Sequence, residues 1–202
     1  MDLHGPKVKI SRALGIAITP KAARIMNRKP QPPGQAATSR GRRRKISDYK
    51  LQLLEKQKLR AQYNISERQL VNYYAQAQKG LGNTGEELVS ILECRLDALV
   101  ARAGFAPTIY AARQFVNHGH FTVNGKKVDI PSYRVKPGDV IAVKQKSRRM
   151  PAFIEASESG SSMVTYINFD RENLTAKLLR VPERSEVPVI CEVQTVVEFY
   201  SR

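Results

Sequence analysis

The residues best suited to chemistry in this sequence are the cations, histidines and amides between positions 113 and 136. Guanidinium and ammonium groups bind phosphate oxygens, while tyrosine and asparagine side chains form hydrogen bonds with sugars and bases. The pattern therefore predicts a surface that recognises nucleic acid by shape and charge. Its members are Arg113, His118, His120, Asn124, Lys126, Lys127, Tyr133, Arg134 and Lys136.

A helix followed by a hairpin is expected to position these side chains. Apolar residues recur at three- and four-residue spacing from Ala111 to Val116, which predicts a helix, and Gly119 is expected to end it. Asn124-Gly125 predicts a tight turn between two short strands. Residues 140–143 are expected to complete a small, mostly antiparallel sheet. We therefore predict an α+β fold with a helix-plus-hairpin RNA-binding module.

The charge of the chain is large and unevenly distributed. The formal net charge is +16, and residues 1–60 hold 16 of the 34 lysines and arginines but only 3 of the 18 acidic residues. A protein this basic needs a polyanion as its partner, and nucleic acid is the usual one. Proline and glycine interrupt residues 1–45, so we expect an extended basic arm that becomes ordered on that partner.

Helical patterns follow the arm. We expect a first helix capped by Ser47 or Asp48 and a second that opens with a capping box at 66–69. A third helix should open with a capping box at 84–87 and run to Gly104. Residues 157–162 have the composition of a loop, whereas residues 163–169, 174–181 and 187–200 have strand-like patterns. We divide the chain into an arm (1–45), a helical domain (46–94, completed by 187–202), a module (95–155) and packed strands (156–186).

The cysteines and the N-terminus point to a reducing compartment. Cys94 and Cys191 both lie in apolar patterns that predict buried thiols, and their spacing does not suggest a disulfide framework or a zinc site. Neither a secretory signal nor an apolar run of about 20 residues is visible. We expect no metal, no cofactor, no membrane partner and no small-molecule substrate.

The segment RLDALVARAGFAPTIYAARQFVNHGHFTVNGKKVDIPSYRVKPGDVI (95–141) resembles the RNA-binding module named after the fourth protein of the bacterial small ribosomal subunit. The family's other motifs are resembled, in the same order, by MDLHGPKVKISRALG (1–15), SDYKLQLLEKQKLRAQYNISERQLVNYY (47–74), GNTGEELVSILECRLD (82–97) and VVEFYSR (196–202). The resemblance covers nearly the whole chain and extends to the bacterial-type or organellar S-four ribosomal protein family. Many relatives carry a zinc-binding cysteine cluster in the arm, and this arm has none.

The resemblance implies a structural constituent of the small subunit, in the cytoplasm or in an organelle matrix or stroma, and not an enzyme. Members bind the 5′ domain of 16S rRNA early in assembly, beside the fifth and third small-subunit proteins. They lie near the path by which mRNA enters and influence decoding accuracy. Carried over, the RNA contacts would be Lys7, Lys9, Arg12, Arg40, Arg42, Arg43, Arg44, Lys45, Tyr49, Lys50, Lys56, Lys58, Arg60, Arg113, Gln114, His118, His120, Asn124, Lys126, Ser132 and Tyr133.

Three other functions deserve comparison with this one. Arg95-Leu96-Asp97 matches the RLD of pseudouridine synthases, some of which carry this module, but it lies in a helix that leads into the module, so a salt-bridged or capping Asp97 is expected. A stand-alone RNA-binding factor, such as a chaperone or ribosome-rescue protein, would explain the module but not the arm and the helices. A DNA-binding repressor would need a recognition helix, which is not evident.

Overall fold

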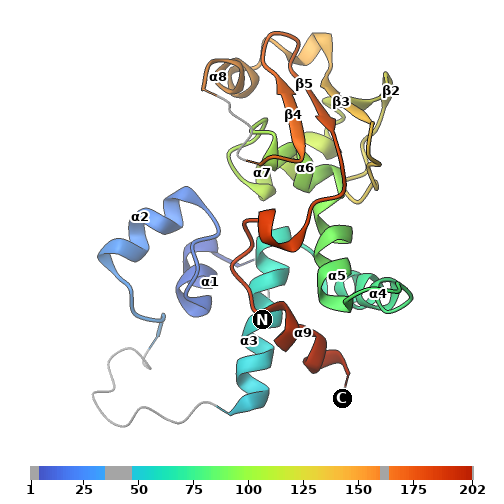
Figure 1. Ribbon diagram of the computed structural model, residues 1–202. Coiled ribbons are helices and arrows are strands. Elements are labelled where there is room, and N and C mark those ends of the chain that lie inside the picture. The colour runs from blue at the N-terminus through green and yellow to red at the C-terminus, as the bar shows by residue number, and fades with distance from the viewer. Residues whose placement is uncertain (1–4, 35–46, 160–163, 202) are drawn as a thin grey trace. The chain divides into compact units, whose positions relative to one another are not determined.

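The computed structural model describes residues 5–34, 47–159 and 164–201 (Figure 1). They fall into two compact units: unit 1 comprises residues 1–75 and 189–202, and unit 2 comprises residues 76–188. Helices make up most of unit 1, and unit 2 combines helices with a five-stranded sheet. The predicted α+β class is confirmed, and the finer division into four segments stays a prediction.

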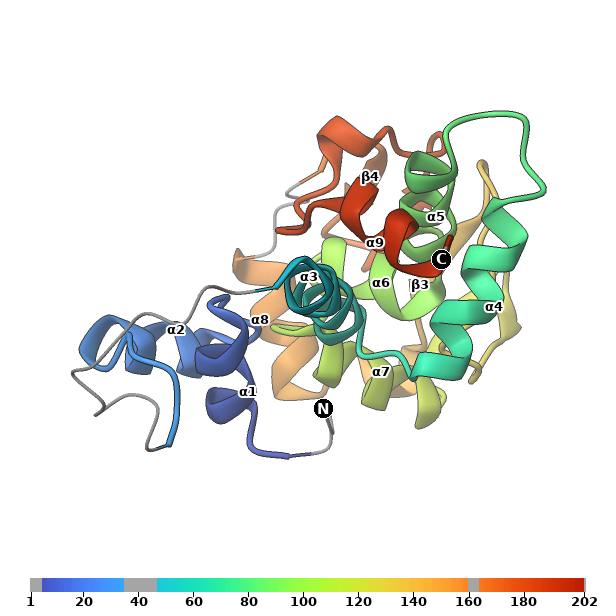
Figure 2. The same ribbon diagram turned by 90° about the horizontal axis from the view of Figure 1, so that it is seen from below.

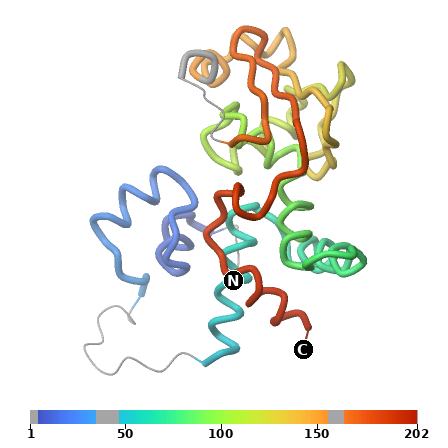
Figure 3. Tube along the Cα trace, in the orientation of Figure 1, coloured from blue at the N-terminus to red at the C-terminus, as the bar shows by residue number. Residues whose placement is uncertain are grey.

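Two helices occupy part of the segment expected to be an extended arm. They are α1 (Lys7–Leu14) and α2 (Pro20–Arg28), which pack on each other and appear in blue in Figure 3. Thr19 caps α2 by accepting a hydrogen bond from the Ala22 amide at 3.2 Å, and Pro20 supplies a preset φ at the first turn. The prediction of an extended arm is therefore wrong for residues 7–28, because local caps and a small apolar cluster offset the ordering entropy.

The remaining helices of unit 1 are α3 (Asp48–Tyr63), the greater part of α4 (Glu67–Ala77) and α9 (Val193–Tyr200). Ser47 caps α3 as predicted. The capping box at the start of α4 is confirmed, because Ser66 and Gln69 exchange hydrogen bonds between side chain and backbone amide at 3.3 and 3.1 Å.

The C-terminal segment is a helix and not the expected strand. α9 packs along α3, as Figures 1 and 2 both show. Valines give residues 193–197 the composition of a strand, but Val193 and Val196 are both buried at the three-residue spacing of a helix face. Packing of that face against α3 outweighs the intrinsic preference of β-branched residues for strands.

Unit 2 begins with two helices where one was expected. α5 (Thr84–Glu93) is capped by the Asn83 side chain and not by the predicted box at Thr84, and α6 (Leu96–Arg102) follows after a break. The break exists because Arg95 forms an isolated antiparallel bridge with Arg134, and the Leu96 amide donates to the Tyr133 carbonyl at 2.9 Å. A continuous helix would leave that connection unmade.

The sheet of unit 2 is entirely antiparallel, with strand order β2-β1-β3-β5-β4. Its strands are β1 (Phe121–Val123), β2 (Lys126–Lys127), β3 (Val140–Val143), β4 (Ile167–Asp170) and β5 (Thr175–Leu178), and the helices α7 (Ile109–Asn117) and α8 (Pro151–Ser159) complete the unit with short 3₁₀ turns at Gln145–Ser147 and Arg184–Glu186. Alternate strand residues pack with α6, α7 and α8 into one core. The strand predicted at 174–181 is thus confirmed in shortened form, and the one predicted at 163–169 is confirmed with later bounds, at 167–170.

Two local predictions in unit 2 have opposite outcomes. The hairpin turn is confirmed, because Asn124 and Gly125 both have positive φ, at 48° and 79°, which matches the strand twist. The loop predicted at 157–162 is wrong for its first part, since α8 continues to Ser159; residues 160–163 lie outside the described residues. Within the described ranges, none of the helices is long and apolar enough to cross a bilayer.

Candidate RNA interface

α7 carries the first group of predicted contact residues and has well-defined ends. Thr108 caps its start by accepting from the Ala111 amide at 3.2 Å. At its end, the Gly119 and His120 amides donate to the carbonyls of Val116 and Phe115 at 2.7 and 3.2 Å. This is the Schellman arrangement, and it requires the left-handed φ of +71° that Gly119 adopts. The polar side of the helix is thereby held in one orientation.

The predicted RNA contacts of unit 2 lie on helices, strands and loops whose apolar residues pack in the core. The polar side chains of the contacts are left at the surface. Tyr133, in the loop that follows the hairpin, is 38% exposed. Gln114, His118, Asn124, Lys126, Ser132 and Tyr133 are exposed, and Arg113 and His120 are half-buried. The structure therefore brings eight of the predicted residues to the surface of one unit.

Asn124 has a structural function that the sequence pattern did not reveal. Its amide nitrogen donates to Asp139 Oδ1 at 2.8 Å, and its amide oxygen accepts from the Val140 amide at 2.9 Å. Asp139 in turn accepts from the Lys136 amide at 2.8 Å. These bonds fasten the hairpin turn to the start of β3. Asn124 is also exposed, so its role as an RNA contact stays a prediction beside this structural role.

Arg113 is held by an ion cluster that it forms with the buried Asp97 and Arg95. Asp97 is fully buried, and its carboxylate accepts two hydrogen bonds from Arg95, at 2.9 and 2.6 Å, and one from the Ala98 amide at 3.0 Å. Arg113 Nη1 lies 3.6 Å from the same carboxylate while its side chain remains 30% exposed. Burial raises the pKa of Asp97, and the two guanidinium groups oppose that shift. The salt-bridged Asp97 expected from the sequence is confirmed, and a nucleophilic role is incompatible with its burial.

A second buried carboxylate, that of Glu93, connects α5 to Tyr166, which directly precedes β4. Glu93 is fully buried, accepts a hydrogen bond from the Tyr166 hydroxyl at 2.6 Å and pairs with Arg102. Burial raises the pKa of Tyr166, and the adjacent Glu93 carboxylate adds to the effect. The hydroxyl therefore stays protonated and keeps donating to Glu93, which fixes the segment before β4.

Some predicted contacts in unit 1 belong to its interior. Lys56 is 6% exposed, pairs with Glu67 at 2.8 Å, and places its ammonium group 4.0 Å from the centre of the Phe199 ring. Arg60 pairs with the same Glu67 at 3.0 Å. The prediction that Lys56 faces RNA is therefore corrected: its charge joins α3 to α4 and α9. Helix periodicity could not show this, because lysines on a helix are usually solvated.

The other predicted contacts of unit 1 divide by exposure. Lys9, Tyr49 and Lys50 are exposed, whereas Lys7, Arg12 and Lys58 are half-buried. Arg12 donates to the Gln31 carbonyl at 2.9 Å, and Lys58 pairs with Glu55 at 2.6 Å. Arg40, Arg42, Arg43, Arg44 and Lys45 lie outside the described residues.

The cation missed by sequence analysis is Lys144. It follows β3 directly, and its amide donates to the His120 carbonyl at 2.9 Å, which places it beside the end of α7. Phe121 pairs with Val143 in the sheet, so the strand register alone puts Lys144 opposite His120. A sequence analysis that had assigned this register would have included it.

The histidines and cysteines that the structure describes do not form a metal site. Among the described residues, no three histidine, cysteine, aspartate or glutamate side chains are grouped to hold an ion. His120 Nδ1 lies 2.9 Å from Ser147 Oγ. Cys94 is a buried free thiol, as predicted, and burial raises its pKa to about 11, whereas Cys191 is only half-buried.

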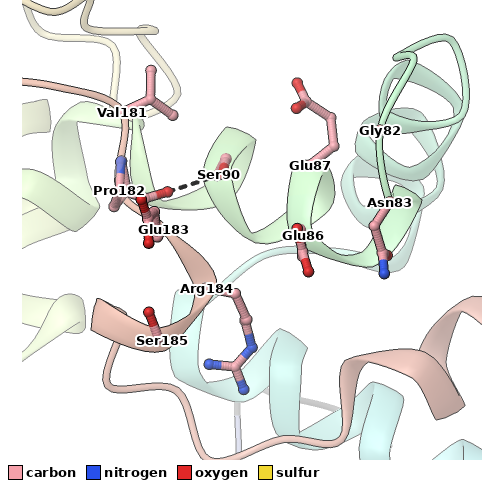
Figure 4. A pocket seen from close by; sticks show the side chains of 10 residues that line it. All are labelled: Gly82, Asn83, Glu86, Glu87, Ser90, Val181, Pro182, Glu183, Arg184 and Ser185. Carbon is pink, nitrogen blue, oxygen red and sulfur yellow. Dashed lines mark hydrogen bonds between the residues drawn. The ribbon is translucent and has the colours of Figure 1, made fainter.

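A hollow of about 730 Å³ lies beside the start of α5 and carries the opposite charge (Figure 4). Glu86, Glu87 and Glu183 line it, together with the cation of Arg184. Ser90 of α5 donates to the Pro182 carbonyl at 3.1 Å, and this hydrogen bond joins the two segments that border the hollow. Carboxylates repel phosphate, so we do not include this hollow in the candidate RNA interface.

Comparison with known proteins agrees with this geometry. Residues 94–141 match the family described as "S4 domain", and residues 2–93 match "Ribosomal protein S4/S9 N-terminal domain". The small ribosomal subunit protein uS4 of Streptomyces avermitilis is 55% identical over 201 residues, which cover 98% of this chain and 97% of that protein. The uS4 protein of Thermobifida fusca is 48% identical over 205 residues, covering all of both chains, and that of Micrococcus luteus is 52% identical over 200 residues, covering 96% and 95%. The resemblance inferred from the motifs is thus confirmed, and this chain belongs to the uS4 family of structural, non-enzymatic small-subunit ribosomal proteins.

Proposed function

We propose that this chain binds 16S rRNA directly and is one of the first proteins to do so on the 5′ domain, where it nucleates assembly. The observation that carries the proposal is the exposed polar side of α7, the β1–β2 hairpin and the 132–136 loop on unit 2. Its donors and cations suit phosphate, sugar and base edges, and its apolar side is locked in the core.

The family resemblance supports the finer parts of the proposal. Relatives lie beside the fifth and third small-subunit proteins and near the path by which mRNA enters, and we propose the same partners and the same influence on decoding accuracy here. On this proposal the protein works on the ribosome, in the bacterial cytoplasm or in the matrix or stroma of an organelle. The exposed Lys9, Tyr49 and Lys50 of unit 1 would add contacts outside the module.

Competition binding at fixed salt tests the proposal. Labelled RNA of the 16S 5′ domain is bound by the full chain and competed with unlabelled 5′-domain RNA, tRNA or random duplex DNA. We expect strong preference for the folded rRNA domain. If about 6–10 phosphates are neutralised, affinity should fall by about 10³–10⁵ between about 50 and 200 mM salt. Equal competition by all three nucleic acids would contradict the proposal and favour a stand-alone RNA-binding factor.

A pair of variants assigns the interface. Gln114→Ala combined with Lys126→Ala removes two exposed side chains, and we expect weaker binding to rRNA and a salt slope lower by about 1. Lys79→Ala is the matched control, because Lys79 is an exposed lysine of unit 2 in the turn after α4. Equal affinity of the double variant and the control would show that α7 and the hairpin do not contact the RNA.

A further inference from the structure

The side chains of Lys127, in β2, and Lys144, directly after β3, both extend to Gly119, the glycine that terminates α7. A Cβ atom placed on Gly119 would lie 2.8 Å from Lys127 Cε, 3.4 Å from Lys127 Nζ and 3.8 Å from Lys144 Nζ. Lys127 belongs to β2 and Lys144 follows β3, and these strands flank β1 on opposite sides. Both ammonium groups therefore lie within 4 Å of one point above Gly119.

The absence of a side chain at Gly119 makes this arrangement possible. Its φ of +71° closes α7, and the space that a side chain would fill is occupied by the end of Lys127. Gly15 provides a comparison, because it ends α1 with a φ of +72° and has nothing within 4 Å of the corresponding Cβ position. The close packing at Gly119 is thus additional to what a helix end requires.

The pKa values of neighbouring groups are shifted by the positive charges of these lysines. The rings of His118 and His120 lie 5.9 Å apart between centroids. Burial lowers the pKa of His120, and the positive charges of His118 and Lys144 lower it further. Asp129 pairs with Lys127 at 3.0 Å, and its pKa is lowered by the hydrogen bond from Lys127 and also by the charge of Lys144.

We propose that Lys127 and Lys144 together bind a single phosphate of the RNA backbone above Gly119; this inference rests on the proposed rRNA binding. Charge-assisted N–O hydrogen bonds span about 2.7–2.9 Å, so ammonium groups that meet over one point both reach oxygens of one phosphate group. Asp129 is half-exposed and holds Lys127 in the free protein, and the incoming phosphate replaces it as the partner of Lys127. Neither lysine belongs to the set of contacts implied by the family resemblance.

Sharing one phosphate has a distinctive salt signature. Each phosphate neutralised contributes about 0.7–0.9 to the slope of log affinity against log salt. Lys127→Ala and Lys144→Ala should each weaken binding to 5′-domain RNA several-fold while leaving the slope nearly unchanged, because the other lysine still neutralises the phosphate. The double variant should lose about 0.7–0.9 of slope. Loss of that amount in each single variant, and twice that amount in the double variant, would show two separate phosphates and overturn the proposal.

Gly119→Ala tests the role of the glycine against Gly15→Ala. Both substitutions place a side chain at the same positive φ, but only the first displaces Lys127. We expect Gly119→Ala to lower rRNA affinity to that of Lys127→Ala, and to have little further effect in the Lys127→Ala background. Because either variant can be less stable, binding is measured below the onset of its thermal unfolding. Full affinity of folded Gly119→Ala would contradict the proposal.

Failure of this inference and failure of the proposed function have different outcomes. If the parent chain shows no preference for 5′-domain RNA over tRNA and duplex DNA, the proposed function itself fails. If the parent shows that preference but the double variant Lys127→Ala Lys144→Ala keeps the affinity and slope of the parent and of Lys79→Ala, only the two-lysine site fails. A preference in the parent together with loss in the double variant supports both.

Discussion

Asp97→Asn is the substitution that separates a structural from a chemical role of the RLD motif most sharply. The carboxylate is fully buried and neutralises Arg95, which is itself 1% exposed, by two hydrogen bonds. An asparagine has nearly the same shape but no charge, and its amide group presents donors toward the donors of Arg95. The substitution therefore removes the negative charge that faces the buried guanidinium group of Arg95 and leaves only the dipole of an amide oxygen in its place.

The expected cost follows from this burial. Removing one partner of a buried ion pair typically costs about 3–5 kcal/mol, because the remaining charge has lost both water and its partner. A domain of this size is stable by about 5–15 kcal/mol, so this one change would remove at least about a fifth of the stability. Replacing both members by apolar residues, as in Arg95→Met with Asp97→Leu, should recover much of the loss, since the buried guanidinium group is then removed together with its carboxylate and Arg113 is partly exposed to water.

Urea unfolding followed by far-ultraviolet circular dichroism measures this effect, and it suits a chain that contains no tryptophan. We expect a large decrease in the midpoint for Asp97→Asn and no measurable change for Asp129→Asn, whose ion pair with Lys127 is exposed to solvent. A midpoint for Asp97→Asn within error of the parent would refute the reasoning. It would mean that water or other polar groups around Arg95 compensate for the lost carboxylate charge.

Two further predictions concern other buried polar contacts. Tyr166→Phe removes the hydroxyl that donates to the fully buried Glu93, and we expect a loss of about 1–3 kcal/mol in urea unfolding; unchanged stability would contradict the role of this bond. Burial raises the pKa of Glu67, but hydrogen bonds from Lys56 and Tyr200 outweigh it and lower the pKa below 4.5. The ionised Glu67 therefore stabilises the fold fully above pH 4.5, and this contribution is lost as the pH falls through the lowered pKa. Glu67→Gln should therefore melt below the parent at pH 7 and approach it near pH 3, and a gap of constant size would contradict this.

Local signals predicted the core of the module because each was sufficient in itself. Asn124-Gly125 specifies a turn with two positive φ values, and a glycine after periodic apolar residues specifies the end of α7. These features depend on residues that are adjacent in the chain, so the sequence shows them directly. The same holds for the capping box at Ser66 and Gln69.

Three of the predictions that proved wrong depended on distant partners. α9 has the composition of a strand, and only packing on α3 makes it a helix. The break between α5 and α6 exists because Arg95 bridges to Arg134. Lys56 is buried because Glu67 and Phe199 receive its charge. None of these partners could be identified from the residues near each position, so propensity and periodicity gave the wrong answer.

The distribution of acidic residues explains how a nearly balanced segment can present a cationic surface. Residues 61–202 hold 18 cations and 15 acids, which suggests little attraction for RNA. Yet Glu93 and Asp97 are fully buried against arginines, and Glu86, Glu87 and Glu183 face the hollow beside α5. These five acids therefore do not lie beside Gly119, where Lys127 and Lys144 meet. The field at that point is set by where the carboxylates lie, and the net charge of the segment is a poor guide to it.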